Sequence, residues 1–209
     1  PTVAKLNKMR DAWRKDLGGA IEPGDLDAAW ELLARQKRYL PEQGLLGSTP
    51  ELDALLAKQS RPDNAAANGS SIAFLAEFAG KSCLFLADAH PDVLCASLKR
   101  LLAARGVQRL VVDAVKVSHH GSKGNTTDEL MSLIESPRFL FSTNGAQFGH
   151  PDKEAVRRVI GRSVRQKPEL YFNYLSDHNK EWSSLDRQRT LNYSGIFNLN
   201  QGSPLVVQL

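Results

Sequence analysis

The feature that most constrains the fold is an alternation of strand-like and helical patterns that begins near residue 71. Short runs rich in apolar and β-branched residues predict strands, and apolar residues at helical spacing lie between them. The predicted strands are 71–78, 82–87, 110–117, 138–142, 169–174 and 204–209, and the predicted helices are 91–104, one opened by a capping box at 126–129, and 151–163. Strands that alternate with helices form layered sheets, so the pattern predicts an α/β (α+β) fold.

The first part of the chain is helical in pattern. Apolar residues recur at helical spacing over 3–17 and 26–39, and a third, short helix is expected over 50–58. We therefore expect residues 1–60 to form a helical insertion or partner-facing segment, and residues 68–209 to form the α/β unit.

The composition allows a packed core and argues against two classes of protein. The chain is 42% hydrophobic, and its net charge of +4 falls short of the dense basic patch of a dedicated nucleic-acid binder. No apolar run reaches the roughly 18 to 20 residues of a membrane span, and the N-terminus lacks a signal-peptide profile. Cys83 and Cys95 lie in apolar runs and are expected to be buried free thiols rather than a disulfide. We therefore expect a cytoplasmic protein.

Side chains suited to metal binding follow three predicted strands. Asp88 follows the second strand, His119 and His120 follow the third, and His150 ends the loop after the fourth. Ligands bind at the carboxyl edge of α/β sheets, so these residues are expected to meet there. A carboxylate with imidazoles suits zinc, manganese or iron, which favours a two-metal hydrolytic site. Taken alone, Asp88 is equally consistent with an N-cap or turn before the next helix.

Other polar residues allow more than one interpretation. His150 precedes Pro151 and is predicted at a helix N-cap, where the helix dipole keeps imidazole neutral and favours an anion. His90 stands in the same His-Pro-Asp order and is interpreted as structural, whereas His178 is interpreted as surface. Asn68 begins an Asn-Gly-Ser-Ser run that either offers polar groups to a phosphate or forms a plain loop. The chain has no P-loop, no Gly-x-Ser-x-Gly elbow and no Cys-x-x-Cys pair.

The ordered motifs resemble the metallo-β-lactamase superfamily, in the branch that includes the hydrolase domain of bacterial DNA-uptake channel proteins and its stand-alone relatives. In that branch a hairpin ends in Gly-Asp, a strand leads into Lys-Val-Pro-His-His-Gly-Ser, and Tyr-Gly-His-Pro closes the site. This chain has Leu86-Ala87-Asp88, then Lys-Val-Ser-His-His-Gly-Ser at 116–122, then Phe-Gly-His-Pro at 148–151. The match covers residues 68–160.

The resemblance implies a metal-dependent hydrolase, and in this branch the substrate is often a phosphodiester. It implies that Asp88 and His120 bind metal, with Asp88 bridging two divalent ions such as Zn²⁺ or Mn²⁺. His119 then faces the substrate as a catalytic residue, although either of the adjacent histidines suits the metal. His150 is the second catalytic residue and contacts the phosphate or a metal. A metal-bound hydroxide would attack phosphorus, as in a phosphodiesterase or nuclease.

Two further residues are assigned to substrate binding, and the resemblance also shows what the chain lacks. Asn68 stands where other branches place another histidine ligand, and Ser122 ends the His-His-Gly-Ser run. The superfamily's principal motif, His-x-His-x-Asp-His or a variant of it, belongs upstream, and residues 1–67 contain no histidine. The family fold is an αββα sandwich of two similar halves. We therefore expect this chain to be the C-terminal half, preceded by a helical segment.

A half-domain needs a partner. The missing N-terminal half, or a second copy of the chain, would complete the two-metal site and cover the exposed sheet. Nucleic acid or another phosphodiester is the expected substrate, with the basic run at 157–167 as a candidate contact, and no membrane is expected. The alternative is a non-catalytic binding or assembly module that retains a partial metal site.

Overall fold

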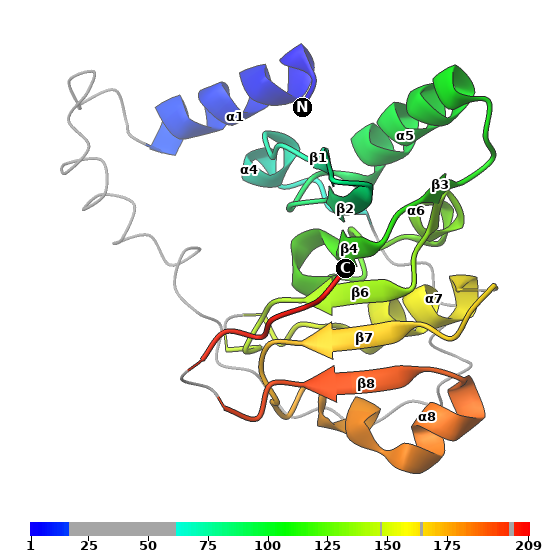
Figure 1. Cartoon of the computed structure of the whole chain (residues 1–209). Coiled ribbons are helices and arrows are strands. Elements are labelled where there is room, and N and C mark those ends of the chain that lie inside the picture. The colour runs from blue at the N-terminus through cyan, green and yellow to red at the C-terminus, as the bar shows by residue number, and fades with distance from the viewer. Residues whose placement is uncertain (17–61, 147, 164, 201–202) are drawn as a thin grey trace.

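The computed structural model describes residues 1–16, 62–146, 148–163, 165–200 and 203–209, and Figure 1 shows the whole chain. The chain is of the mixed α/β class, as its sequence predicts. The helices predicted at 26–39 and 50–58 lie outside the described residues.

A six-stranded sheet with the order β1-β2-β4-β6-β7-β8 forms the centre of the molecule. Its strands are β1 (Phe74–Phe78), β2 (Lys81–Phe85), β4 (Ala114–Lys116), β6 (Arg138–Phe141), β7 (Glu169–Phe172) and β8 (Ser194–Phe197). The first two form an antiparallel hairpin, and every later pairing is parallel. A second sheet pairs β3 (Leu110–Val111) with β5 (Ile134–Glu135). Parallel pairing brings the carboxyl ends of β2, β4, β6 and β7 to one edge.

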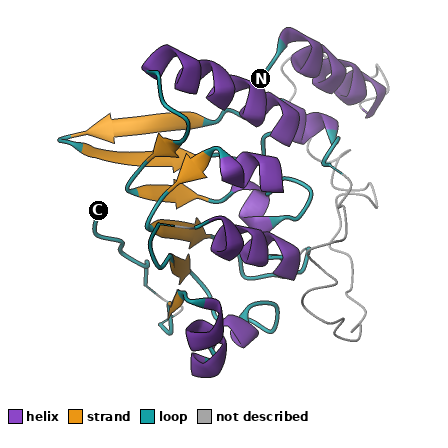
Figure 2. Cartoon of the chain, turned by 90° about the vertical axis from the view of Figure 1, so that its right-hand side faces the viewer, coloured by secondary structure: helices purple, strands orange, loops and turns teal. Residues whose placement is uncertain are grey.

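Helices cover one face of the sheet (Figure 2). The helices are α1 (Val3–Asp16), α4 (Ala66–Gly69), α5 (Pro91–Arg105), α6 (Asp128–Ser132), α7 (Lys153–Arg162) and α8 (Leu185–Leu191), with 3₁₀ turns η2 (Ser118–Gly121) and η3 (Lys180–Ser183). A row of paired residues crosses the sheet on the helix side and belongs to the buried core: Leu84, Val115, Phe139 and Leu170. Each such side chain stabilises the fold by about 1.5–3 kcal/mol.

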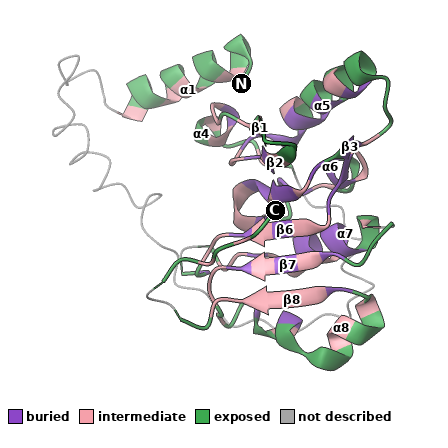
Figure 3. Cartoon of the chain, viewed as in Figure 1, coloured by how far each residue is buried: buried purple, intermediate pink, exposed green. Residues whose placement is uncertain are grey.

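The opposite face of the sheet is only partly covered. Pairing places one row of six side chains across it, and none of them is fully buried: Phe74, Phe85, Lys116, Leu140, Tyr171 and Ile196. Residues 203–209 cross this face, and no described helix covers it (Figures 1 and 2). Intermediate burial therefore runs along β6, β7 and β8 (Figure 3).

Two strand predictions were wrong in detail. Residues 204–209 form no strand, and the last strand of the sheet is β8, which pairs with β7. The predicted strand 110–117 divides into β3 and β4 because Asp113 turns toward the hairpin, where its Oδ2 accepts hydrogen bonds from Ser82 N (2.8 Å) and Ser82 Oγ (3.1 Å).

Two helix starts also differ from the prediction. The cap of α6 is Thr127, whose Oγ1 accepts from Leu130 N at 3.2 Å, whereas Thr126 is buried in the loop before it. Helix α7 begins after Asp152, so His150 is not its N-cap. The geometry predicted for His150 occurs instead at His90. His90 is the N-cap residue of α5, and Pro91 begins the helix after it.

The expectation of buried free thiols is met in full only at Cys95. Cys83 and Cys95 are both free; Cys95 is buried, and Cys83 is only partly buried. No helix in the described part of the chain is long and apolar enough to span a membrane.

Candidate functional site

A cavity of ≈ 430 Å³ opens at the carboxyl ends of the strands. It contains all four residues that the sequence assigns to metal binding or catalysis, namely Asp88, His119, His120 and His150. The other lining residues are Ser142, Thr143, Asn144, Phe148, Asn173 and Tyr174. The expectation that side chains from three separate loops meet at this edge is therefore correct.

The two adjacent histidines lie in a strained turn. His119 and His120 have φ values of 43° and 56°, in the left-handed region that few residues other than glycine adopt. The turn is tied to the end of the hairpin by two hydrogen bonds to Ala87 O, from His119 N at 2.9 Å and from Ser118 Oγ at 3.1 Å. Ala87 is itself left-handed, with φ 49°, which explains why a glycine suits this position in the branch that the chain resembles.

His120 and Asp88 face each other across the cavity. His120 Nδ1 lies 2.6 Å from Ser142 O, and because a carbonyl only accepts, Nδ1 carries the proton. Nε2, which is an acceptor in the neutral ring, lies 3.9 Å from Asp88 Oδ1. The two side chains are partly exposed, 43% for His120 and 37% for Asp88. These are two neighbouring ligand atoms of the kind that zinc or manganese takes.

Too few candidate metal ligands come together among the described residues to hold an ion by themselves. No group of three or more His, Cys, Asp or Glu side chains among them is placed to hold an ion. Structural and catalytic zinc sites use three or four protein ligands. Asp88 and His120 alone fall short of that number, so binding of an ion by them would require further ligands.

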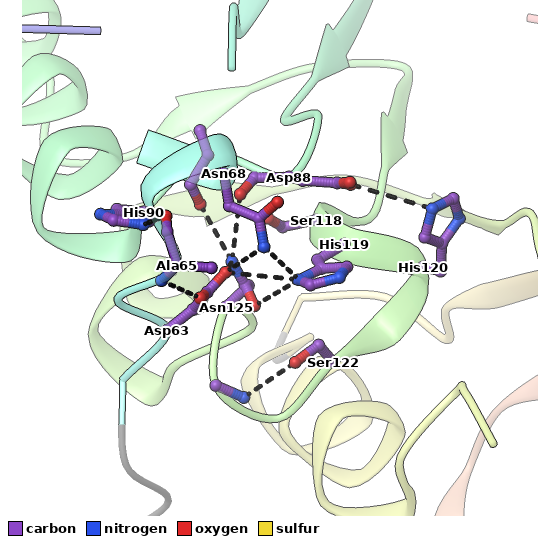
Figure 4. Close-up of polar contacts among 12 residues, drawn as sticks. Asp63, Ala65, Asn68, Asp88, His90, Ser118, His119, His120, Ser122 and Asn125 are labelled. Atoms are coloured by element: carbon purple, nitrogen blue, oxygen red, sulfur yellow. Dashed lines mark hydrogen bonds and ion pairs between the residues drawn. The ribbon is translucent and has the colours of Figure 1, made fainter. Parts of the chain in front are cut away.

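His119 belongs to a buried polar network (Figure 4). Its Nδ1 lies 2.9 Å from Asn125 Oδ1 and 3.4 Å from Asp63 Oδ2. Burial raises the pKa of Asp63, but hydrogen bonds from Ala65 N, Asn125 and Asn68 oppose burial, and the pKa is lowered overall. Asp63 is therefore held as a carboxylate behind the histidine ring.

His150 is the most enclosed imidazole of the cavity, with 13% of its side chain exposed. Burial lowers its pKa; Asp152 opposes this, and His119 and His120 add to it. The ring is thus neutral mainly because it is buried, and not because of the helix dipole that the sequence suggested. Its Nδ1 lies 3.7 Å from Asp152 Oδ2 and has no hydrogen-bond partner within the described ranges.

The two residues predicted to bind substrate lie outside the cavity lining. Asn68 donates to Asp63 Oδ2 at 2.7 Å, and Ser122 Oγ accepts from Gly124 N at 3.2 Å. Both side chains hold the loops around His119. His90 is buried and bonded to Ala65 O at 2.8 Å, as its structural interpretation requires, and His178 is exposed.

Sequence reasoning missed several lining residues. Ser142, Thr143 and Asn144 follow β6, and Asn173 and Tyr174 follow β7. The strand-end rule that located the histidines would have found these polar residues too. Asp63 and Asn125, which contact His119 from behind, could not be found by this rule because neither of them follows a strand.

The basic run at 157–167 is largely used within the protein. Arg158 is buried, and its Nη1 donates to Lys123 O at 2.7 Å and to Thr126 O at 3.0 Å. Arg162 Nε bonds to Asp128 at 3.0 Å. These contacts clamp the loop after the His-His turn onto α7 and α6.

Comparison with known proteins identifies no relative: no family model, curated protein or solved structure matches the chain. The resemblance to the metallo-β-lactamase superfamily therefore rests on the ordered sequence motifs alone.

Proposed function

We propose that this chain contributes half of the active site of a metal-dependent phosphodiester hydrolase, a phosphodiesterase or nuclease similar to the C-terminal half of the metallo-β-lactamase fold. The observation that carries the proposal is the convergence of Asp88, His119, His120 and His150 in one cavity. Four chemically apt side chains from three loops meet at the edge where α/β sheets bind ligands.

Asp88 and His120 are the residues that would hold a divalent ion, Zn²⁺ or Mn²⁺. A bound cation acts as a Lewis acid on a phosphoryl oxygen and makes water a better nucleophile. Further ligands have to come from outside the described residues, and we assign them to a partner segment that forms the other half of the site.

His119 and His150 face the substrate. The cavity volume of ≈ 430 Å³ lies in the range that holds small ligands, so it accommodates a phosphate with one flanking group. Phe148 lies at the cavity with 58% of its surface exposed and gives an apolar wall beside the two rings. This combination suits an anionic centre joined to an aromatic or sugar-like group.

Hydrolysis of bis(4-nitrophenyl) phosphate with added Mn²⁺ or Zn²⁺, by the chain together with the segment that supplies the other half of the site, tests the proposal. Asp88→Ala and His120→Ala should each lower the metal-stimulated rate by at least about 100-fold, beyond the roughly 10- to 100-fold typical of outer-shell partners. Asp186→Ala is the control for Asp88→Ala, because the Asp186 side chain is 93% exposed and absent from the cavity lining. Metal-stimulated hydrolysis that survives both substitutions would contradict the assigned roles.

A second candidate, a non-catalytic binding or assembly module, is favoured by the partly covered sheet face. Its row of side chains from Phe74 to Ile196, which is mainly apolar but includes Lys116, suits the face of another sheet, either the missing half or a second copy of this chain. Analytical ultracentrifugation checks this, since a clean monomer contradicts a partner surface. Two tightly bound metal ions per chain would exclude the non-catalytic alternative.

The two free thiols fit a reducing compartment, and we propose the cytoplasm.

A further inference from the structure

We propose that Asp63 and Asn125 are positioning residues that fix His119 in a single tautomer, with the proton on Nδ1 and an unprotonated Nε2 presented to the cavity. Asp63 lies on the segment before β1, far from the histidines in sequence. Its backbone N donates to Gly124 O at 3.2 Å, so this segment is tied directly to the loop after the His-His turn.

The first step is the orientation of Asn125, which is fully buried. Its Nδ2 lies 2.9 Å from Asp63 Oδ2 and 3.3 Å from the carbonyl oxygens of Asp88 and Ala89. All three oxygens only accept hydrogen bonds, so the amide nitrogen must face them. The amide oxygen of Asn125 therefore faces the histidine, 2.9 Å from Nδ1 of His119.

The second step follows from the acceptors around Nδ1 of His119. Asn125 Oδ1 and Asp63 Oδ2 both accept, so Nδ1 has to carry the hydrogen. The nearby amide of Asn68, 3.4 Å from Nδ1, donates instead to Asp63 at 2.7 Å. A neutral imidazole with its proton on Nδ1 keeps its lone pair on Nε2, at the opposite edge of the ring.

The third step is the anchoring of Asp63 itself. Its side chain is 12% exposed, and it accepts from Ala65 N at 2.9 Å, from Asn68 and from Asn125. A carboxylate can accept from all these donors at once, whereas an alkyl side chain accepts from none. Its charge also favours an N–H on the near side of the His119 ring. Asp63 and Asn125 thus hold the His119 ring in place through hydrogen bonds, as the partners of catalytic and metal-binding histidines commonly do.

The role of the His119 tautomer in catalysis rests on the proposed function, whereas the assignment of the tautomer does not. An unprotonated Nε2 accepts a proton or binds a cation, and it does not donate to a phosphate oxygen. His119 then resembles His120, whose Nδ1 is also fixed by an acceptor, Ser142 O. Both rings present acceptor nitrogens to the same cavity.

The test is a long-range ¹H–¹⁵N correlation spectrum of histidine-labelled protein, without substrate or metal, in alkaline buffer where free histidine is neutral. In the wild-type chain, His119 should show a protonated Nδ1 and a bare Nε2. The double variant Asp63→Ala/Asn125→Ala should shift His119 toward the Nε2–H form that free histidine prefers. Asp92→Ala is the control, because Asp92 bonds to Lys5 and lies outside this network.

Two results would overturn the proposal: a wild-type His119 with its proton on Nε2 or in a mixture, or a folded double variant with an unchanged tautomer. If the double variant does not fold, the wild-type spectrum still decides. The readout needs no turnover, so a failed hydrolysis assay and a failed tautomer assignment remain distinguishable.

Discussion

Gly121 ends the His-His turn, and replacing it with alanine tests how tightly that turn is packed. Its φ of +90° lies outside the range that L side chains readily adopt. An added Cβ would lie 2.6 Å from Pro151 Cβ and 3.0 Å from Phe141 Cδ1. Neither neighbour moves easily, because one belongs to a proline ring and the other to a phenylalanine that is 2% exposed.

The expected loss for Gly121→Ala is about 1–4.5 kcal/mol of unfolding free energy. It combines roughly 1–2 kcal/mol for the left-handed conformation with roughly 1–3 kcal/mol for overpacking, less about 0.4–1 kcal/mol from the stiffer unfolded chain. Gly106→Ala is the matched control: Gly106 has φ +64°, and nothing lies within 4 Å of its added Cβ. Without a clash, the control should lose only about 1 kcal/mol or less.

Urea unfolding followed by circular dichroism measures both losses. The comparison requires that both variants unfold with the wild-type m-value, the slope of unfolding free energy against urea concentration. The gap between the variants is the contribution of packing against Pro151 and Phe141. Equal losses for Gly121→Ala and Gly106→Ala would refute the claim that close packing holds the His-His turn in place.

Three further changes have definite expected outcomes. Ala87→Gly should raise the unfolding free energy by up to about 1 kcal/mol, because Ala87 is left-handed at φ 49°. The gain should appear as a higher urea midpoint. Tyr193→Phe should lower stability by about 1–2 kcal/mol because it removes the 2.9 Å bond to Trp182 O. Burial raises the pKa of Tyr193 to about 12, so an absorbance titration should show it ionising late. Burial lowers the pKa of His150 in the folded chain, so the unfolded chain takes up the proton first as the pH falls. Wild-type stability should then fall more steeply between about pH 7 and pH 5 than that of His150→Asn, and equal slopes would contradict this.

The strand-end rule worked for the site because it depends on topology alone. Parallel pairing of β2, β4 and β6 brings the residues after them to one edge, whatever the loops look like. Asp63 could not be found in this way. It lies in an irregular segment, and only the folded chain brings it to His119, 56 residues later in the sequence.

The last strand shows why local propensity failed. Residues 204–209 have the better apolar pattern, yet the chain uses Ser194–Phe197, which contains Gly195. A Cβ on Gly195 would lie 2.8 Å from Trp182 O, so close approach of the η3 backbone requires glycine there. Gly195 lowers the strand propensity of this segment, but it also allows β8 to pack against η3. Propensity could not reveal this, because the requirement comes from a neighbour in space.

The strain in the His-His turn follows from the need to aim two adjacent side chains at one cavity. In a strand, consecutive side chains point to opposite faces, so an extended chain would send His119 and His120 apart. Left-handed conformations at both residues bend the backbone and bring both rings to the cavity. Each left-handed residue costs about 1–2 kcal/mol, and the fixed acceptors at Nδ1 of each ring help to offset that strain. A turn kept only for packing would be more stable with glycine or asparagine at these positions. The presence of histidine at both positions therefore supports a role for the ring nitrogens that face the cavity.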